Sequence, residues 1–178
     1  MSACDRPSEA VLTAPAEAAP ALEPTPEPVP TEPPPTEPDL ASDDALLGTI
    51  EVSPGFMPDP LTRVGTTRGG PVNVHEWDDR CEGWIAEHPD ALVQVARPFA
   101  ELALMAASGS DTTMVVVGPD GEARCTDDDE DSHPVLRAAF EAGLHRVWIG
   151  THEREEHAPY VLTLTEFEDT LPSQSLLN

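Results

Sequence analysis

The sequence predicts an all-β protein, an antiparallel β-sandwich preceded by a disordered Pro/Glu-rich N-terminal segment. Two observations carry this prediction. About eight short β-prone segments, separated by turn residues, follow residue 46, and this spacing is typical of β-sandwiches. Before residue 40 the chain has eleven of its 21 prolines, interleaved with Ala, Glu and Thr, and almost no large apolar residues. We therefore expect a linker over 1–45, a sandwich over 46–168 and a tail over 169–178.

The linker carries a cysteine with its own role. Repeated proline biases the chain to extended polyproline II, so this segment is expected to act as a stiff spacer. Met1-Ser-Ala-Cys4 has the small-small-Cys pattern of a bacterial lipoprotein cleavage site, although no charged or apolar region precedes it. We therefore predict that Cys4 carries a lipid anchor on an exported protein, in the periplasm or at the outer membrane or cell surface.

Net charge excludes two classes of function. The chain has 34 acidic residues against nine Arg and no Lys, a formal charge of −25. Binding to nucleic acid needs clustered basic residues, and so does adsorption to anionic lipid, so neither is expected. Contact with a membrane is predicted only through the anchor at Cys4.

The first strands are expected in a turn-rich stretch. Residues 48–53 have the composition of a short strand, and the prolines and glycine of 54–60 indicate turns. Residues 65–70 are assigned to a loop. Residues 71–75 are a candidate edge strand, which leads through Trp77 and Cys81 to Trp84 and Ile85.

Two longer strands are expected next. Residues 90–96 alternate apolar and polar side chains, which indicates a strand. Residues 99–106 have helical propensity, but Leu102 and Leu104 recur at a period of two. A strand is therefore preferred there.

The remaining strands surround a tight turn. Residues 112–117 predict a core strand with Met114 and Val116 pointing inward, and Pro119-Asp120-Gly121 has the chemistry of a turn. Residues 134–140 fit either a short strand or a helical turn. Strands are also expected at 143–150 and at 159–166, and the first has His145, Val147 and Ile149 on one face. Everything from Phe167 onward is expected to fray.

A resemblance follows from five of these segments in order. Together they resemble the bacterial pre-peptidase C-terminal (PPC-like) domain over residues 90–166. This resemblance implies a jelly-roll-like β-sandwich in secreted or surface proteins, acting as an accessory to another function, and it implies no catalytic residues. The five segments are 110–116, 119–121, 127–128, 143–149 and 160–164.

The chain departs from that family pattern at two places. His145 stands where the family strand usually has Tyr, so a partly polar contact is expected to replace a buried aromatic one. Cys81 and Cys125 are not part of the pattern, and they suggest a subgroup in which a disulfide joins the two. The odd cysteine is then Cys4.

The acids after Cys125 allow two interpretations. Calcium prefers six to eight hard oxygen ligands, and Asp111, Asp127 and Asp128 are placed to converge at one end of the sandwich as calcium ligands. The alternative is a solvated acidic loop, which is the usual role of a charge run. Residues 129–131 are assigned to solvated charge.

The function expected is a non-catalytic exported or surface-anchored accessory or binding module, monomeric, whose partner is a protein or a glycan. One alternative is a metal-dependent hydrolase with a site among His133, His152, His157 and the acids. His152 and His157 do not have the spacing of a zinc protease, which needs His at i and i+4. The other alternative is a structural stalk and cap.

Tryptophans raise the glycan hypothesis. Exposed aromatic side chains on sandwich faces can stack on sugars, and the candidates are Trp77, Trp84 and Trp148. For Trp148 we expect packing against the second face of its sheet instead.

Overall fold

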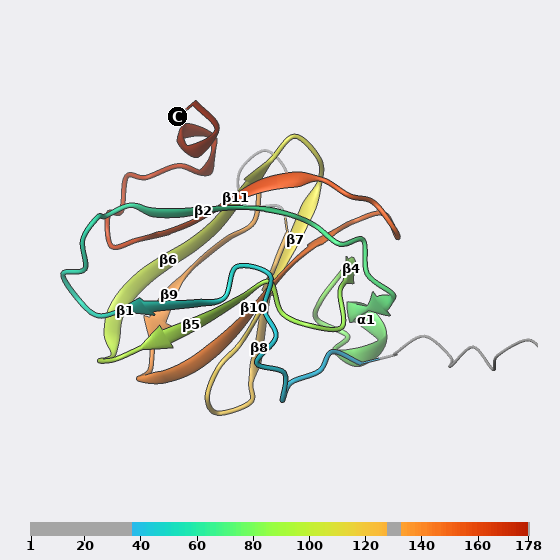
Figure 1. Cartoon of the computed structure of the whole chain (residues 1–178), viewed down its shortest axis with the longest axis horizontal. Coiled ribbons are helices and arrows are strands. Elements are labelled where there is room, and N and C mark those ends of the chain that lie inside the picture. The colour runs from blue at the N-terminus through green and yellow to red at the C-terminus, as the bar shows by residue number, and fades with distance from the viewer. Residues whose placement is uncertain (1–36, 128–132, 178) are drawn as a thin grey trace, which may run out of the picture. The chain divides into compact units, whose positions relative to one another are not determined.

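The computed structural model describes residues 37–127 and 133–177, so Cys4, most of the linker and Asp128 lie outside the described residues. Two β-sheets face each other (Figure 1). The elements are β1 (Thr49–Val52), β2 (Leu61–Thr66), β3 (Val72–Asn73), α1 (Val74–Trp77), β4 (Trp84–Ile85), β5 (Ala91–Val95), β6 (Phe99–Ser108), β7 (Thr112–Val117), β8 (Ala123–Thr126), β9 (Val135–Phe140), β10 (Gly143–Thr151), β11 (Pro159–Thr165) and the 3-10 helix η1 (Pro172–Leu177).

The first sheet, sheet A, is built around β10. That strand pairs antiparallel with β5, β7 and, at Thr151, with β4, while β3 extends the sheet beyond β4 and β8 extends it beyond β7. β1 pairs with β5 in parallel, the one departure from the antiparallel order among the described pairs. The second sheet, sheet B, has the order β2-β11-β6-β9.

The main core lies between the sheets. Met114 and Val116 point into it, as predicted, together with Val147 and Ile149 from β10. Leu102 and Leu104 join them from β6, which confirms that residues 99–106 form a strand. Burial of these aliphatic side chains is the dominant stabilising term of the sandwich.

A second core lies on the other face of sheet A. Val115, Val117 and Trp148 pack there against the flap, which is defined as residues 72–85 and contains β3, α1 and β4. Trp148 is fully buried, as the packing interpretation expected. Because both of its faces are covered, all six residues of β7 are buried.

The Cys81–Cys125 disulfide joins the flap to β8, as the departure from the family pattern suggested. Cys81 lies in the second core and is 1% exposed. The bond closes a separation of 44 residues, which in the chain-entropy model stabilises the folded state by about 4 kcal/mol.

Several elements differ from the sequence expectation. The ambiguous stretch 134–140 is strand β9. β2 begins before the expected loop at 65–70 and was not predicted. Of the candidate edge strand at 71–75, Val72–Asn73 form β3, whereas the helix α1 begins at Val74. The expected fraying after Phe167 is wrong for residues 172–177, because they form η1, and Ser175 Oγ shares a hydrogen bond of 2.8 Å with Thr163 Oγ1 on β11.

Candidate functional site

β2 is an open edge of sheet B. Within the described ranges it pairs only with β11. Thr67 N–H, just past its end, donates to Ala158 O (2.8 Å). Since antiparallel ladders alternate, this bond sets the phase, and the backbone groups of Thr62, Val64 and Thr66 point away from β11.

This edge is protected over only half of its length. Arg63 Nη1 donates to Thr62 O (2.9 Å), which occupies one outward carbonyl and places a charge on the edge. The next outward positions, Val64 and Thr66, carry no charge of their own. The Val64 side chain is 73% exposed, a large value for an aliphatic residue in a strand. The second half of β2 therefore offers backbone donors and acceptors beside an apolar side chain.

A cavity lies beside this half of the strand, and we call it the flank cavity. Its volume is about 420 Å³. Apolar side chains line it from two segments, Leu46 and Leu47 before β1 and Val64 on β2. Polar groups come from Arg68 and His157. This combination of apolar wall and a few polar groups is the usual composition of a ligand site.

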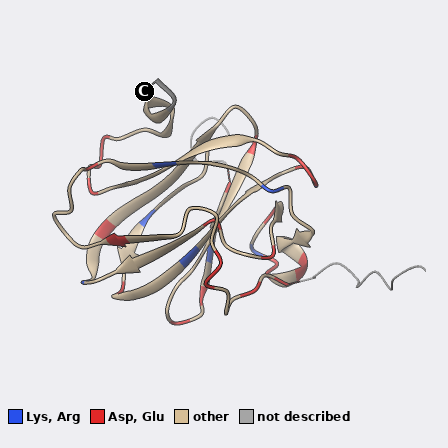
Figure 2. Ribbon diagram, viewed as in Figure 1, with Lys and Arg blue, Asp and Glu red and all other residues tan. Residues whose placement is uncertain are grey.

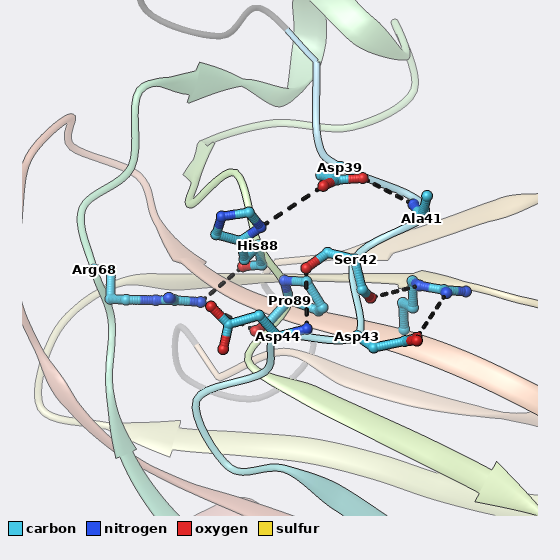
Figure 3. Close-up of polar contacts among 9 residues, drawn as sticks. Asp39, Ala41, Ser42, Asp43, Asp44, Arg68, His88 and Pro89 are labelled. Atoms are coloured by element: carbon cyan, nitrogen blue, oxygen red, sulfur yellow. Dashed lines mark hydrogen bonds and ion pairs between the residues drawn. The ribbon is translucent and has the colours of Figure 1, made fainter.

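The two leucines are placed by the strap, defined as residues 39–47, most of which the sequence analysis assigned to the linker. Leu47 N–H donates to Asp90 O (2.7 Å) and Asp39 N–H to Glu87 O (2.8 Å). Arg146 Nε on β10 donates to Ser42 O (3.2 Å). Figure 3 shows further polar contacts of the strap, among them those of Asp39 with Ala41 N–H and with the His88 ring. The strap therefore forms one wall of the flank cavity.

Arg68 fixes the floor of the flank cavity. Its Nη2 donates to His88 O (2.8 Å) and to Pro89 O (3.0 Å), as Figure 3 shows. Its Nε is buried and has no hydrogen-bond partner among the described residues. The guanidinium thus ties the end of β2 to the segment that enters β5.

Asp90 joins the two sheets behind the flank cavity. It is 1% exposed, and its Oδ2 accepts from Ile149 N–H (2.8 Å) while its Oδ1 accepts from Tyr160 O–H (3.0 Å). Burial raises the pKa of Asp90 to about 6, against the opposing effect of the Ile149 bond and of Arg68. Burial, together with the Asp90 carboxylate, also raises the pKa of Tyr160.

Tyr160 in turn explains the glycine in β2. A Cβ on Gly65 would collide with the phenol ring of Tyr160. Gly65 therefore lets the ring reach Asp90 beneath the strand. The open edge therefore lies directly above a buried polar pair.

His157 closes the flank cavity from the β10–β11 loop. Its Nδ1–H donates to Thr67 O (3.0 Å), while its side chain is exposed. The hydrogen bond fixes the tautomer, so Nε2 is an acceptor that faces solvent.

The predicted calcium ligands lie at one end of sheet A. Asp111 precedes β7 and Asp127 follows β8, and these two strands are paired, with Met114 opposite Thr126. Asp111 O also accepts from His152 N–H (3.4 Å). Asp128 lies outside the described residues. Within residues 37–127 and 133–177 no three His, Cys, Asp or Glu side chains are grouped to hold a metal ion, so calcium binding stays a prediction.

The histidines of the alternative hydrolase site come from three separate places. His157 lies at the flank cavity, His152 is exposed just after β10, and His133 precedes β9. In the part of the chain that the structure describes, they form no metal-binding group with the acids. No helix there is long and apolar enough to span a membrane.

Charge is spread unevenly over the surface. Figure 2 shows acidic residues on the strap, on α1 and on the β10–β11 loop, and few basic residues between them. Tryptophans contribute little open aromatic surface. Trp84 is half-buried beneath the Arg154 guanidinium, 5.0 Å from its ring centre, and Trp77 packs against the second core.

The sequence did not indicate the flank cavity. Its walls come from a strand that was not predicted and from a segment assigned to the linker. One signal was present: Leu46 and Leu47 are two adjacent large apolar residues directly after the Pro-rich stretch.

Comparisons with known proteins concern the fold. No family model matches the chain, and none of the curated proteins matches its sequence. Among solved structures the chain is similar to the pre-peptidase C-terminal domain of collagenase from Bacillus anthracis, with 12% identity and a TM-score of 0.44 over 66% of this chain and 94% of that chain. This likeness agrees with the resemblance found in the sequence.

The chain is also similar to a second solved structure. It is Aeromonas hydrophila PliG, a periplasmic lysozyme inhibitor of g-type lysozyme, with 12% identity and a TM-score of 0.35 over 66% of this chain and 96% of that chain. At TM-scores below 0.5, neither structure informs the function of this chain.

Proposed function

We propose that this chain is an exported, non-catalytic binding module that recognises a protein partner by adding an extended segment of that partner to β2. The observation that carries the proposal is the unprotected second half of β2, where Val64 is 73% exposed beside a cavity of about 420 Å³. Strand addition to an open sheet edge is a recurrent mode of peptide recognition.

The geometry supplies both parts of such recognition. The outward N–H and C=O groups of Val64 and Thr66 give main-chain affinity that does not depend on partner sequence. The flank cavity gives specificity, because side chains that alternate along the added strand would enter it every second residue. Leu46 and Leu47 favour an apolar side chain there, and the Arg68 guanidinium favours an acceptor group such as a carboxylate.

Export is supported by the disulfide. Bonds such as Cys81–Cys125 persist in oxidising compartments and are rare in reducing ones. A chain whose flap and β8 are joined by a disulfide is therefore compatible with the periplasm or the cell exterior.

Anchoring is the second part of the proposal. Cys4 is the third cysteine and lies outside the disulfide, at the start of the Pro-rich segment. We propose that a lipid on Cys4 tethers the module to a membrane. Metabolic labelling with a radioactive fatty acid in the native host should mark the wild-type protein and not Cys4→Ala, and equal labelling of both would overturn this attachment.

Site-specific photo-crosslinking tests the binding mode. A benzophenone amino acid at Val64 should give a covalent adduct in the native host, and mass spectrometry of the adduct identifies the partner. The matched control is the same probe at Thr49, an exposed position on β1, the edge strand of the other sheet.

The identified partner then decides between outcomes. Isothermal titration should show at least tenfold weaker binding for Val64→Lys than for Thr49→Lys, because a charged side chain blocks strand addition. Equal affinity of the two variants, or a glycan as the crosslinked species, would contradict the proposal.

A further inference from the structure

A second cavity lies at the other sheet, and we call it the turn cavity. It is formed by the turn between β7 and β8 and by the start of β10, and its volume is about 170 Å³. Three carboxylates line it, from Asp120, Glu122 and Glu141, with one guanidinium from Arg124 and the imidazole of His145. Three negative groups against one positive group leave this cavity with a formal charge of −2.

His145 has an unused acceptor in this cavity. The residue is 0% exposed, and its Nε2–H donates to Glu141 O (2.9 Å). Since a carbonyl can only accept, Nε2 carries the proton and Nδ1 has a free lone pair. Nδ1 is buried and has no hydrogen-bond partner among the described residues.

Nδ1 faces the turn that forms the cavity. A Cβ built on Gly118 would lie 3.6 Å from Nδ1 and 2.7 Å from Asp120 Oδ1. A side chain at Gly118 would therefore press on the Asp120 carboxylate, next to the ring nitrogen. Burial lowers the pKa of His145, which favours the neutral imidazole with its lone pair.

The one cation of the turn cavity is engaged elsewhere. The Arg124 guanidinium lies over the Phe140 ring, 4.7 Å from its centre, and its Nη1 donates to Ala139 O (3.1 Å). Phe140 also packs edge-on against His145, with ring centres 5.0 Å apart. Among the carboxylate oxygens of the cavity, Asp120 Oδ1 accepts from Glu122 N–H (3.0 Å), which leaves its second lone pair for a further donor.

We propose that the turn cavity binds a cationic N–H donor, the guanidinium or ammonium group of a basic side chain on a protein partner. Such groups only donate hydrogen bonds and carry positive charge, so they match a neutral ring nitrogen and three carboxylates. An anion would meet an excess of negative charge. A metal ion is disfavoured because these residues form no group arranged to hold one among the described residues.

NMR of the full chain with 15N-labelled histidine tests this directly, and the probes are methylguanidinium chloride and methylammonium chloride. Binding should move the His145 Nδ1 resonance saturably, in the direction expected when a ring nitrogen accepts a hydrogen bond. Sodium chloride at equal ionic strength is the control. A response to only one probe identifies arginine or lysine as the recognised side chain, and a response to both assigns the site to either.

Two glycine variants make the test specific. Gly118→Ala places a Cβ 2.7 Å from Asp120 Oδ1 and so displaces this carboxylate from its position near Nδ1, and the response should disappear. Gly109→Ala is the matched control, because a Cβ there has nothing within 4 Å, and the response should persist. If Gly118→Ala does not fold, Asp120→Asn replaces it and should weaken binding about tenfold by removing a charged acceptor.

The proposal is overturned if neither probe moves Nδ1 more than sodium chloride does. It is also overturned if a folded Gly118→Ala or Asp120→Asn variant responds as the wild type does.

Discussion

β7 and β2 show how differently two strands of one sandwich can be treated. β7 is buried at all six positions, with the main core on one face and the flap on the other. β2 is buried only at Leu61, and its residues 62–64 are exposed. The difference lies in position: β7 is an interior strand between β10 and β8, whereas β2 ends its sheet. Burial therefore concentrates stability at β7, whereas the edge of β2 stays open to solvent.

The regions around β7 and β2 are also held in place by different kinds of interaction. The flap is held on sheet A by the covalent Cys81–Cys125 bond. The open flank is held by noncovalent contacts, among them hydrogen bonds of the strap, of Arg68 and of the Asp90–Tyr160 pair. The contribution of a disulfide to stability does not depend on pH in this range, whereas the contribution of a buried carboxylate does. Stability should thus be divided into a redox-sensitive and a pH-sensitive part.

Removing the disulfide should have the largest effect. The Cys81→Ala/Cys125→Ala variant should lose about 4 kcal/mol of unfolding free energy, because its unfolded chain regains the entropy of an open loop. Urea unfolding curves measure this loss, and Cys4→Ala is the control that should lose nothing. An unchanged urea midpoint after reduction of the wild type would show that the disulfide does not stabilise the attachment of the flap.

Asp90 should give the open flank its pH dependence. Burial raises its pKa from 3.8 to about 6, so the folded state binds this proton more tightly than the unfolded state does. The resulting stability is fully present below pH 3.8 and is lost as pH rises through about 6. A shift of about two units corresponds to about 3 kcal/mol.

Urea midpoints between pH 4 and pH 7 can isolate this contribution. The decline in stability over that range should be smaller in Asp90→Asn than in the wild type, whereas Glu51→Gln, on the exposed face of β1, should keep the wild-type profile. Parallel profiles of Asp90→Asn and the wild type would mean that Asp90 does not titrate as its burial requires.

Gly150 tests how closely the flap lies on sheet A. A Cβ on Gly150 would collide with Trp84 O of β4, so Gly150→Ala should push the flap outward and cost about 1–3 kcal/mol. Gly109→Ala, where a Cβ meets nothing within 4 Å, should cost far less. Thermal unfolding of both variants makes the comparison. Equal midpoints would show that the flap can move away from Gly150 without a loss of stability.

Calcium, if bound near Asp111 and Asp127 as predicted, would add a third stabilising interaction at that end of sheet A. For an extracellular-type site with a Kd of about 1 mM, 10 mM calcium should add about 1.4 kcal/mol. Differential scanning calorimetry with calcium and with magnesium measures the shift, and Asp111→Asn should reduce it. A melting midpoint that does not change on addition of calcium would contradict the prediction of a calcium site.

Val64 should show the smallest effect on stability. Val64→Thr changes an exposed side chain and should alter the unfolding free energy by less than about 0.5 kcal/mol. Val115→Thr on β7 places the same hydroxyl in a fully buried position and should cost about 1–3 kcal/mol. Similar losses in the two variants would erase the distinction between the strands.

How far the sequence could reach depended on the kind of signal. Alternation identified the strands that carry Leu102, Met114 and Val147, because a half-buried strand must repeat its apolar residues at period two. β2 escaped because Thr62-Arg63-Val64-Gly65 hardly alternates: an edge strand that buries little needs few apolar residues. η1 was not predicted because half of its six residues are polar and its two large apolar residues come only at its end.

The sequence by itself determined that the chain is a β-sandwich, that Met114 and Val116 face its core, and that two of three cysteines belong to the folded part. These follow from local patterns of side chains. Only the tertiary structure decided that the flap covers Val115 and Trp148, that the strap borders a cavity, and that His145 keeps an unpaired ring nitrogen. Each of these depends on which distant segments meet, and strand order and edge position are not written in any local pattern.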